Sequence, residues 1–226
     1  WSVGAARCVP NPASLAWVAG GCEEAGVVVN RIAGVILCAL VSPAFGIVAA
    51  LVRVLDGRPV LFAQERAGFG GRPFRVLKFR TMRAPAVAGE ADEDRITALG
   101  RVLRASSLDE LPSLWNVARG EMALVGPRPL PMAYVERYSP AQGRRLEVKP
   151  GLTGVVQTRG RNALSWDEKF DLDTWYVENR SWRLDWRLIL ETPFAVLRAR
   201  GISHPGHATM PVFEGAVGSW EGTGTT

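Results

Sequence analysis

Histidine and cysteine are scarce in this sequence, and their scarcity argues against several kinds of active site. The two histidines of the 226-residue chain, His204 and His207, both lie in a Gly- and Pro-rich tail. The three cysteines, Cys8, Cys22 and Cys38, show no CxxC spacing, so neither a disulfide framework nor a zinc site is predicted. A Ser-His-Asp or Cys-His mechanism is therefore not expected, and acid–base chemistry is left to carboxylates.

The two ends of the chain have little hydrophobic periodicity. Residues 1–26 mix Pro, Gly, Ala and Ser and lack the basic start of a secretory signal peptide, which predicts a poorly ordered lead-in. Residues 202–226 are rich in Gly, Pro and Thr, and this composition predicts a disordered tail. Between these ends we predict a membrane segment over residues 27–58 and a folded domain over residues 59–201.

Acidic residues are fewer than basic ones, and the formal net charge of +5 is carried mostly by arginine. This balance suits a partner that is rich in phosphate, such as a nucleotide, a nucleic acid or an anionic membrane. The sequence carries no recognised nucleic-acid-binding motif. Nucleic acid is therefore not an expected partner.

One uncharged and mostly apolar run, residues 32–52, is long enough to cross a membrane. Ser42 and Pro43 lie at its middle, where a proline removes a helix hydrogen bond, and arginines flank both of its ends. Because an excess of positive charge marks the cytoplasmic side of a membrane, both ends are expected on that side. We predict a re-entrant helix–break–helix hairpin with its break at Ser42 and Pro43. A straight span kinked at Pro43 and a buried core helix are the alternatives.

Two short strands, residues 59–66 and 73–82, are predicted on either side of a Gly-Phe-Gly-Gly turn. Because strand side chains alternate between two faces, Lys78 and Arg80 share one face of the second strand. These two cations form either a wall for a phosphate group or a solvated basic face. The spacing alone does not choose between the two interpretations.

Asp109 and Glu110 form an adjacent carboxylate pair. Ser106 or Ser107 can cap a helix whose apolar stripe runs to Ala118, which would place the pair in the first turn of that helix. Free backbone N–H groups and the helix dipole stabilise negative charge there. Carboxylates beside fixed guanidinium groups suit phosphoryl transfer, although acidic residues at a helix start are also common without any function.

Arg128 stands between two prolines in the segment Gly-Pro-Arg-Pro. Prolines hold the backbone stiffly, and a stiff arginine loses less entropy when it binds an oxyanion; the alternative is a plain turn. Residues 155–158 are predicted as a strand that leads to Arg161, within Arg-Gly-Arg-Asn. Glycine beside arginine lets the backbone and the guanidinium group both approach an anion.

Three other segments complete the expected secondary structure. Residues 84–94 predict an acidic loop, and residues 95–104 predict a helix. Residues 166–197 predict a helical region rich in tryptophan. Tryptophan beside arginine suits a membrane interface, and packing in a core explains these tryptophans as well.

Together these motifs resemble those of the bacterial monotopic phosphoglycosyl transferases, the sugar transferases that start surface-polysaccharide and glycan assembly. The resemblance runs from about residue 31 to about residue 202. The motifs occur in the family's order, namely the apolar run with its Ser-Pro break, QERAGFGGRPFRVLKFRTM, RITALGRVLRASSLDELPSLWNV, LVGPRP, KPGLTGVVQTRGRN and KFDLDTWYVENRSWRLDWRLILET.

The resemblance implies a fold and a location. The fold would be α+β, membrane-associated and monotopic, with the re-entrant hairpin, interfacial amphipathic helices and short β-hairpins. Residues 59–201 would form a catalytic sugar-transferase domain on the cytoplasmic face of the inner membrane, in contact with membrane lipids. Gly34 departs from the family, which often has Asp there, and this leaves the anchoring of the hairpin open.

The resemblance also implies a reaction. Such enzymes transfer sugar-1-phosphate from a UDP-sugar to polyprenyl (undecaprenyl) phosphate and release UMP. Asp109 would attack the phosphorus and form a phosphosugar-aspartate intermediate, with Mg²⁺ bound close to it, and Glu110 would position or deprotonate the incoming phosphate. The basic residues around the phosphates would be Lys78, Arg80, Arg104, Arg128 and Arg161. The alternative is a non-catalytic membrane scaffold that binds polyprenyl phosphate or partner proteins.

Overall fold

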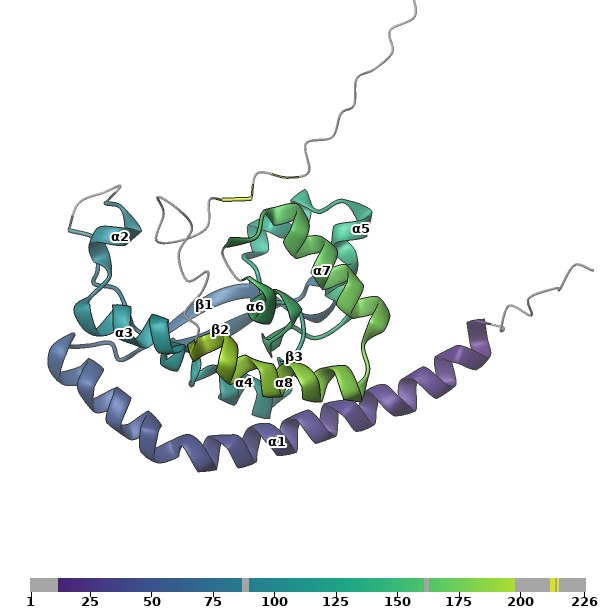
Figure 1. Cartoon of the computed structure of the whole chain (residues 1–226), viewed down its shortest axis with the longest axis horizontal. Helices are drawn as coiled ribbons and strands as arrows, with labels where there is room; N and C mark the ends of the chain where they lie inside the picture. The colour runs from purple at the N-terminus through teal and green to yellow at the C-terminus, as the bar shows by residue number, and fades with distance from the viewer. Residues whose placement is uncertain (1–11, 87–89, 161–162, 198–211, 214, 216–226) are drawn as a thin grey trace, which may run out of the picture.

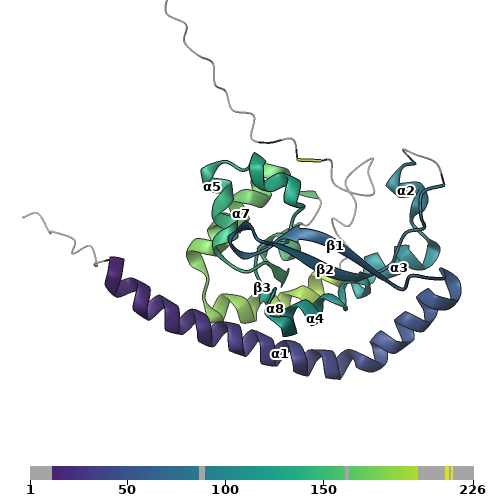
Figure 2. The same cartoon turned by 180° about the vertical axis from the view of Figure 1, so that it is seen from behind.

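The computed structural model describes residues 12–86, 90–160, 163–197, 212, 213 and 215, and at residues 12–25 and 93 it describes the backbone alone. Figure 1 shows one long helix, α1 (Pro12–Leu55), that curves along one side of a body built from short helices and two small sheets. Figure 2 shows the same arrangement from behind, with the two longer strands crossing the body above α1. The mixed helix and sheet content agrees with the predicted α+β class.

The predicted apolar run lies within α1. The part Gly26–Leu55 is the one helix in the described chain that is long and apolar enough to cross a membrane. Only 11% of its most apolar stretch is buried inside the protein, so α1 is not the core helix of a soluble domain. The helix begins at Pro12 and therefore includes residues 12–26, where a poorly ordered lead-in was predicted, while residues 1–11 lie outside the described chain.

The chain remains helical at the Ser-Pro pair. α1 continues through Ser42 and Pro43, and the Ser42 hydroxyl donates a hydrogen bond to the carbonyl of Ala39 at 2.8 Å. A proline inside a helix removes one backbone hydrogen bond and bends the helix, and α1 is drawn as an arc (Figure 1). The predicted break at Ser42 and Pro43 is thus not confirmed.

The first half of α1 is fixed to the body by polar contacts. The backbone N–H of Leu124 donates to the Asn30 side chain at 2.9 Å, and Arg31 donates to the carbonyl of Ala118 at 3.4 Å. A Cβ atom added at Gly34 would lie 2.6 Å from the backbone nitrogen of Ala118. The close approach needs glycine at this position, and it anchors the helix without the family's Asp.

The C-terminal end of α1 is fixed to the same body. Val52 is fully buried and packs in one apolar cluster with Phe79. The Arg80 guanidinium donates to the carbonyl of Asp56 and, at 2.6 Å, to that of Arg58. Cationic side chains commonly satisfy the last carbonyls of a helix in this way. Both ends of the apolar segment therefore contact a single folded body.

The two predicted strands are confirmed. β1 (Leu61–Ala67) pairs antiparallel with β2 (Pro73–Phe79), and the short 3₁₀ turn η1 (Phe69–Gly71) joins them. Gly70 has a φ of 63°, a left-handed conformation that favours glycine. The expected boundary at residues 58 and 59 falls in the connection between α1 and β1.

The free edge of β2 is covered by α4 (Ser113–Arg119). Ser113 donates to the carbonyl of Leu77 at 2.7 Å, and Asn116 accepts from the N–H of Leu77 at 3.1 Å. Asn116 also donates to the carbonyl of Arg75 at 2.8 Å. Both side chains are 1% exposed. They replace the hydrogen bonds that a further strand would supply, which fixes the start of α4 beside β2.

The second sheet corrects one prediction. β3 (Ala123–Val125) pairs in parallel with β4 (Gly151–Thr153), whereas residues 155–158, predicted as a strand, lie in the helix α6 (Val155–Arg159). The predicted strand is wrong because β-branched residues only weakly favour strands, and tertiary packing overrides that preference: Val155 and Val156 are 3% and 5% exposed in the interior.

The remaining elements surround the two sheets. The predicted helix over residues 95–104 is present with shifted bounds, and the predicted helical region over residues 166–197 is divided into two helices at Arg180 and Ser181. The elements are α2 (Asp92–Arg95), α3 (Ala98–Ser106), η2 (Leu108–Glu110), η3 (Met132–Arg137), α5 (Pro140–Gly143), η4 (Arg144–Glu147), α7 (Trp166–Asn179) and α8 (Trp182–Leu197).

Part of the predicted disordered tail packs on the body. Phe213 is 3% exposed and packs with Tyr134, Trp166 and Phe170. Its backbone N–H donates to the Tyr134 hydroxyl at 3.1 Å. Because this aromatic cluster forms only in the folded protein, the composition of the tail gave no sign of it. The other tail residues, apart from 212 and 215, lie outside the described chain.

Candidate active site

The carboxylate pair lies in a sharp turn between α3 and α4. Asp109 and Glu110 belong to the 3₁₀ turn η2, and Ser107 before it adopts a left-handed conformation with a φ of 58°. The predicted position in the first turn of a longer helix is wrong, because α4 begins after Pro112. Ser107 makes no side-chain cap to this turn. The conformation at Ser107, not a helix dipole, directs the pair toward the body.

Glu110 is held by two cations. Its Oε1 atom accepts a hydrogen bond from Lys78 Nζ at 2.6 Å and another from Arg128 Nη2 at 2.8 Å, and its side chain is 19% exposed. Burial on its own would raise the pKa of Glu110, but the charges and hydrogen bonds of Arg128 and Lys78 outweigh it and hold the pKa far below its usual range. Glu110 is therefore ionised throughout the physiological pH range.

Asp109 has the opposite surroundings. It is 9% exposed, and no cation of the described residues lies within ion-pair distance of its carboxylate. Burial raises the pKa of Asp109, and the neighbouring Glu110 charge raises it further; Lys78, Arg128 and Arg104 lower it by less. Asp109 is thus a buried carboxylate that is destabilised when ionised and is not neutralised by a direct partner.

The five predicted basic residues differ in their positions. Lys78 and Arg128 contact Glu110. Arg104 donates to the Thr81 hydroxyl at 2.9 Å, and its charge acts on Asp109. Within the described chain Arg80 makes no hydrogen bond or ion pair with Asp109 or Glu110; its guanidinium is engaged by the carbonyls of Asp56 and Arg58. Arg161 lies outside the described chain.

The segment around Arg128 is fixed by a buried ion pair. The Arg128 carbonyl accepts a hydrogen bond from Arg145 at 2.7 Å, and Arg145 forms an ion pair with Asp173 at 2.8 Å. Both side chains of this pair are almost fully buried. A Cβ atom added at Gly126 would lie 2.5 Å from the carbonyl oxygen of Lys149, so this glycine lets the chain pass close to the neighbouring segment. Sequence reasoning did not identify Arg145 or Asp173, because nothing in the local pattern separates them from surface charges.

One further residue was missed, Arg66 on β1. Together with Lys78, Glu110 and Arg128 it lines a small hollow that is partly open to solvent. Its lining also includes the apolar residues Val76 and Met122. Arg66 lies in the QERAGFGG motif, and only the pairing of β1 with β2 reveals that it faces the site.

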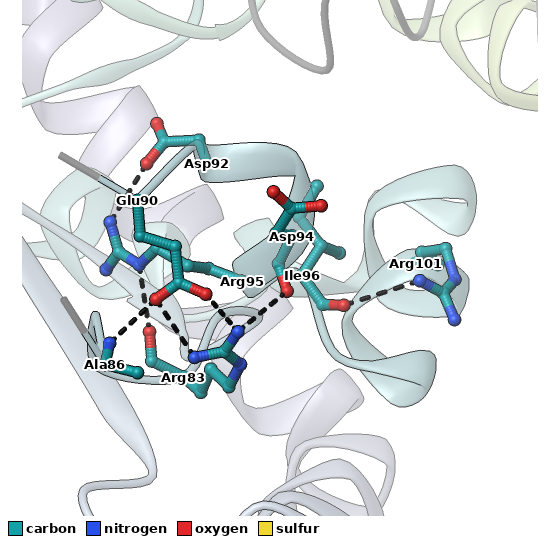
Figure 3. A network of polar contacts seen from close by, with 8 residues as sticks. All are labelled: Arg83, Ala86, Glu90, Asp92, Asp94, Arg95, Ile96 and Arg101. Carbon is teal, nitrogen blue, oxygen red and sulfur yellow. Dashed lines mark hydrogen bonds and ion pairs between the residues drawn. The ribbon is translucent and has the colours of Figure 1, made fainter.

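A separate polar network holds the predicted acidic loop (Figure 3). Arg83 donates to both carboxylate oxygens of Glu90, and the N–H of Ala86 donates to Glu90 at 2.7 Å. Arg95 donates to the carbonyl of Arg83 at 3.2 Å and to the Asp92 carboxylate at 2.9 Å. Two of the loop's acidic side chains are thus neutralised within the loop. Their charges do not oppose an anion at the carboxylate pair.

A magnesium site on the protein alone finds limited support. The described residues contain no group of three or more His, Cys, Asp or Glu side chains that could hold a metal ion. Mg²⁺ commonly binds one or two carboxylates together with substrate phosphates and waters, and Asp109 has a carboxylate free of direct cation contacts. The donor set therefore fits a metal ion that binds with the substrate.

Comparison with known proteins places the chain in a family. The model of the bacterial sugar transferase family matches residues 25–199. An uncharacterized sugar transferase, EpsL, of Bacillus subtilis is 48% identical over 170 residues, which cover 74% of this chain and 84% of that protein. The chain therefore belongs to the bacterial sugar transferase family, as the motifs predicted, and is a phosphoglycosyl transferase.

Two other relatives have names that state a reaction. The UDP-glucose:undecaprenyl-phosphate glucose-1-phosphate transferase of Caulobacter vibrioides is 39% identical over 178 residues, or 73% of this chain and 67% of that protein. The UDP-galactose-lipid carrier transferase of Erwinia amylovora is 40% identical over 182 residues, or 72% of this chain. The match covers only 38% of the Erwinia protein.

Proposed function

We propose that this protein transfers sugar-1-phosphate from a UDP-sugar to polyprenyl phosphate and releases UMP, through a covalent intermediate on Asp109. The observation that carries the proposal is the contrast within the carboxylate pair. Glu110 is bound by two cations at 2.6 and 2.8 Å, whereas Asp109 is buried and has no such partner among the described residues. The names of the Caulobacter and Erwinia relatives support the donor and acceptor classes.

In the first half-reaction an Asp109 oxygen attacks the phosphorus that bears the sugar. The bond from that phosphorus to the UMP oxygen breaks, and the electron pair leaves with UMP. In the second half-reaction an oxygen of the lipid phosphate attacks the same phosphorus and displaces the Asp109 carboxylate. A carboxylate can attack an anionic phosphoryl group only where nearby cations neutralise the developing charge, and Lys78, Arg104 and Arg128 would do so. A bound Mg²⁺, held by Asp109 and the substrate phosphates, would supply further neutralisation.

Glu110 acts as a positioning group in this proposal. A carboxylate whose pKa is held far below its usual range is a weak base, so proton removal from an incoming phosphate is not its role. Its contacts to Lys78 and Arg128 fix both cations beside Asp109 before the substrate arrives. Fixed charges need no reorganisation when the reaction occurs, and this preorganisation is a major source of catalysis.

The membrane part of the proposal rests on α1 and α8. Both ends of the apolar segment of α1 contact the same body, which favours a bent helix that enters the inner membrane from the cytoplasmic face and returns to it over a helix that crosses it. Large apolar side chains on α1 point outward. A second exposed apolar stripe follows α8 at helical spacing and consists of Trp182, Trp186, Leu190, Phe194 and Leu197.

The test is UMP release from a panel of UDP-sugars by the detergent-solubilised protein with polyprenyl phosphate and Mg²⁺. We expect UMP from one donor sugar and a matching polyprenyl-diphosphate-sugar product. Absence of UMP with every donor, from folded protein that is recovered in membranes, would contradict the proposal and favour the non-catalytic scaffold.

A further inference from the structure

Arg66 lies on the face of the sheet that carries Lys78. In the β1–β2 pair, Phe62 is opposite Lys78 and Arg66 is opposite Phe74. Residues opposite each other share a face, and positions two or four residues apart along a strand share it too. Arg66 and Lys78 are therefore cations at the two ends of one face, and the hollow beside Glu110 lies between them.

Arg66 lacks an anionic partner in the described part of the chain. Its guanidinium donates to the neutral Gln64 side chain at 2.5 Å, and no described carboxylate forms an ion pair with it. Glu110, the carboxylate that raises the pKa of Arg66, is already bound by Lys78 and Arg128. Burial and the Arg128 charge lower the pKa of Arg66 to about 10, which measures how unfavourable the uncompensated cation is.

The charges in the site match a diphosphate. Four cations face two carboxylates, which leaves a surplus of two positive charges, and a sugar nucleotide carries one negative charge on each of its two phosphates. The four cations are Arg66, Lys78, Arg104 and Arg128. Without substrate this surplus of positive charge is energetically unfavourable, and an anion bound in the hollow would neutralise it.

The four cations are not equivalent in position. Arg66, Lys78 and Arg128 line the hollow, whereas Arg104 and Asp109 are not among its lining residues. Asp109 thus lies outside the hollow, and Arg66 lies on its wall. If Asp109 attacks a phosphoryl group from one side, the opposite side of that group faces the hollow that Arg66 lines.

We propose that Arg66, together with Lys78 and Arg128, binds the phosphate that flanks the reacting phosphorus opposite Asp109. The inference rests on the proposed function. In an in-line displacement the attacking and leaving oxygens lie on opposite sides of the phosphorus. Asp109 takes one side in both half-reactions, so the UMP phosphate that leaves and the lipid phosphate that later attacks occupy the other side in turn.

This subsite serves both substrates through the same chemistry. As UMP leaves, the electron pair of the broken bond passes to the UMP phosphate oxygen, where Arg66 stabilises the added charge. In the second half-reaction Arg66 positions the lipid phosphate oxygen that forms the new bond as the bond to Asp109 breaks. No other reactant is needed, and one set of donors recognises two phosphates because both present the same tetrahedral anion.

The test compares Arg66→Ala and Arg66→Lys with Arg75→Ala. Arg75 is an exposed arginine of the same strand pair, opposite Glu65 on the other face of the sheet, so its removal gives the same change in net charge. In ping-pong kinetics kcat/KM for each substrate reports its own half-reaction. We would measure it for the UDP-sugar and for polyprenyl phosphate, and exchange of labelled UMP into UDP-sugar without lipid.

We expect Arg66→Ala to lower kcat/KM for both substrates by about ten- to hundredfold. UMP exchange should fall in parallel, and Arg66→Lys should recover only part of the loss because it keeps the charge but not the two-pronged geometry. Arg75→Ala should match the wild type. Thermal unfolding of Arg66→Lys verifies that this variant is folded, so its kinetics test the proposal even where Arg66→Ala is unstable.

Two results would overturn the inference. Equal kinetics for the Arg66 and Arg75 variants would exclude Arg66 as a phosphate ligand, and a loss confined to one substrate would exclude a shared subsite. Either result leaves the proposed function intact as long as the wild type releases UMP. A wild type that releases no UMP refutes the proposed function, and with it this inference.

Discussion

Asp109 and Glu110 are consecutive carboxylates in one turn, and the protein gives them opposite surroundings. Glu110 is bound by Lys78 and Arg128, and its pKa is lowered; Asp109 is buried, no described cation pairs with it directly, and its pKa is raised. Environments that push the pKa values of two similar groups apart commonly assign them different roles in catalysis. The contrast supports the proposal that Asp109 is the reactive group and Glu110 the group that positions the cations.

The largest expected effect on activity follows from removal of the Asp109 carboxylate. We expect Asp109→Asn to lower the rate of UMP release by about a thousandfold or more, because no other group can form the intermediate. Rapid-quench assays with UDP-sugar and polyprenyl phosphate would measure this loss. Substantial activity in the variant would keep the enzyme class and refute the covalent role.

The thermal stability of Asp109→Asn provides the control for its loss of activity. A carboxyl with a raised folded pKa contributes stability below its unfolded pKa of about 3.9 and loses that contribution as pH rises through the folded pKa. The ionised Asp109 carboxylate therefore contributes no net stability. We expect thermal unfolding of Asp109→Asn at or above the wild-type temperature, so its loss of activity would not reflect misfolding.

Removal of the Glu110 carboxylate should lower activity less, and stability more, than removal of the Asp109 carboxylate. We expect Glu110→Gln to lower UMP release by about a hundredfold, as for the loss of one fixed electrostatic group. Stability should fall by about 1–2 kcal/mol, a value reduced because Lys78 and Arg128 are partly exposed. Urea unfolding of the detergent-solubilised protein would measure it.

The pH dependence of that stability loss has a defined sign. A carboxylate with a lowered folded pKa contributes stability above its unfolded pKa of about 4.3 and loses it as pH falls through the folded pKa. The difference between wild type and Glu110→Gln should thus be the same at pH 7 and pH 5. A difference that disappears already at pH 5 would contradict the ion pairs with Lys78 and Arg128.

A third pair of variants separates two cations that the sequence placed together. We expect Lys78→Ala to lower UMP release by about tenfold or more through loss of a charged hydrogen bond. Arg80→Ala should leave activity near wild type and lower stability by about 1–3 kcal/mol, since two carbonyls at the end of α1 lose their donor. An activity loss in Arg80→Ala as large as that in Lys78→Ala would restore Arg80 to the site.

The smallest expected effect is a displacement of the pH profile. Because the pKa of Asp109 is raised by burial and by the Glu110 charge, the acid limb of kcat/KM for the UDP-sugar should lie above the usual aspartate range. In Glu110→Gln that limb should move to lower pH, because one of the two causes is removed. An unmoved limb, or one at higher pH, would show that Asp109 is not the group that titrates.

Local patterns were sufficient for the parts of the site that lie within motifs. The glycine turn and the alternation of side chains predicted β1 and β2, and the motif resemblance identified the carboxylate pair with Lys78, Arg104 and Arg128. These assignments depend on neighbours in the sequence or on family motifs. The structure adds the contrast between the two carboxylates, which arises from side chains more than 15 residues away along the chain.

The remaining features depend on contacts between distant segments. Arg80 follows the end of β2, and its direction is set by the last turn of α1. Arg66 resembled any basic strand residue until the strand register placed it beside the hollow. Residues 155 and 156 become helical because the interior encloses them, and the Arg145–Asp173 pair exists only once α7 packs behind Arg128.

The most direct test of the central claim is intact mass spectrometry of the protein after incubation with its UDP-sugar and no lipid acceptor. The account predicts a mass increase of one phosphosugar on the wild type, located by peptide mapping at Asp109, lost on addition of polyprenyl phosphate and absent in Asp109→Asn. UMP release that needs the lipid and never yields an adduct, or an adduct that persists in Asp109→Asn, would contradict it.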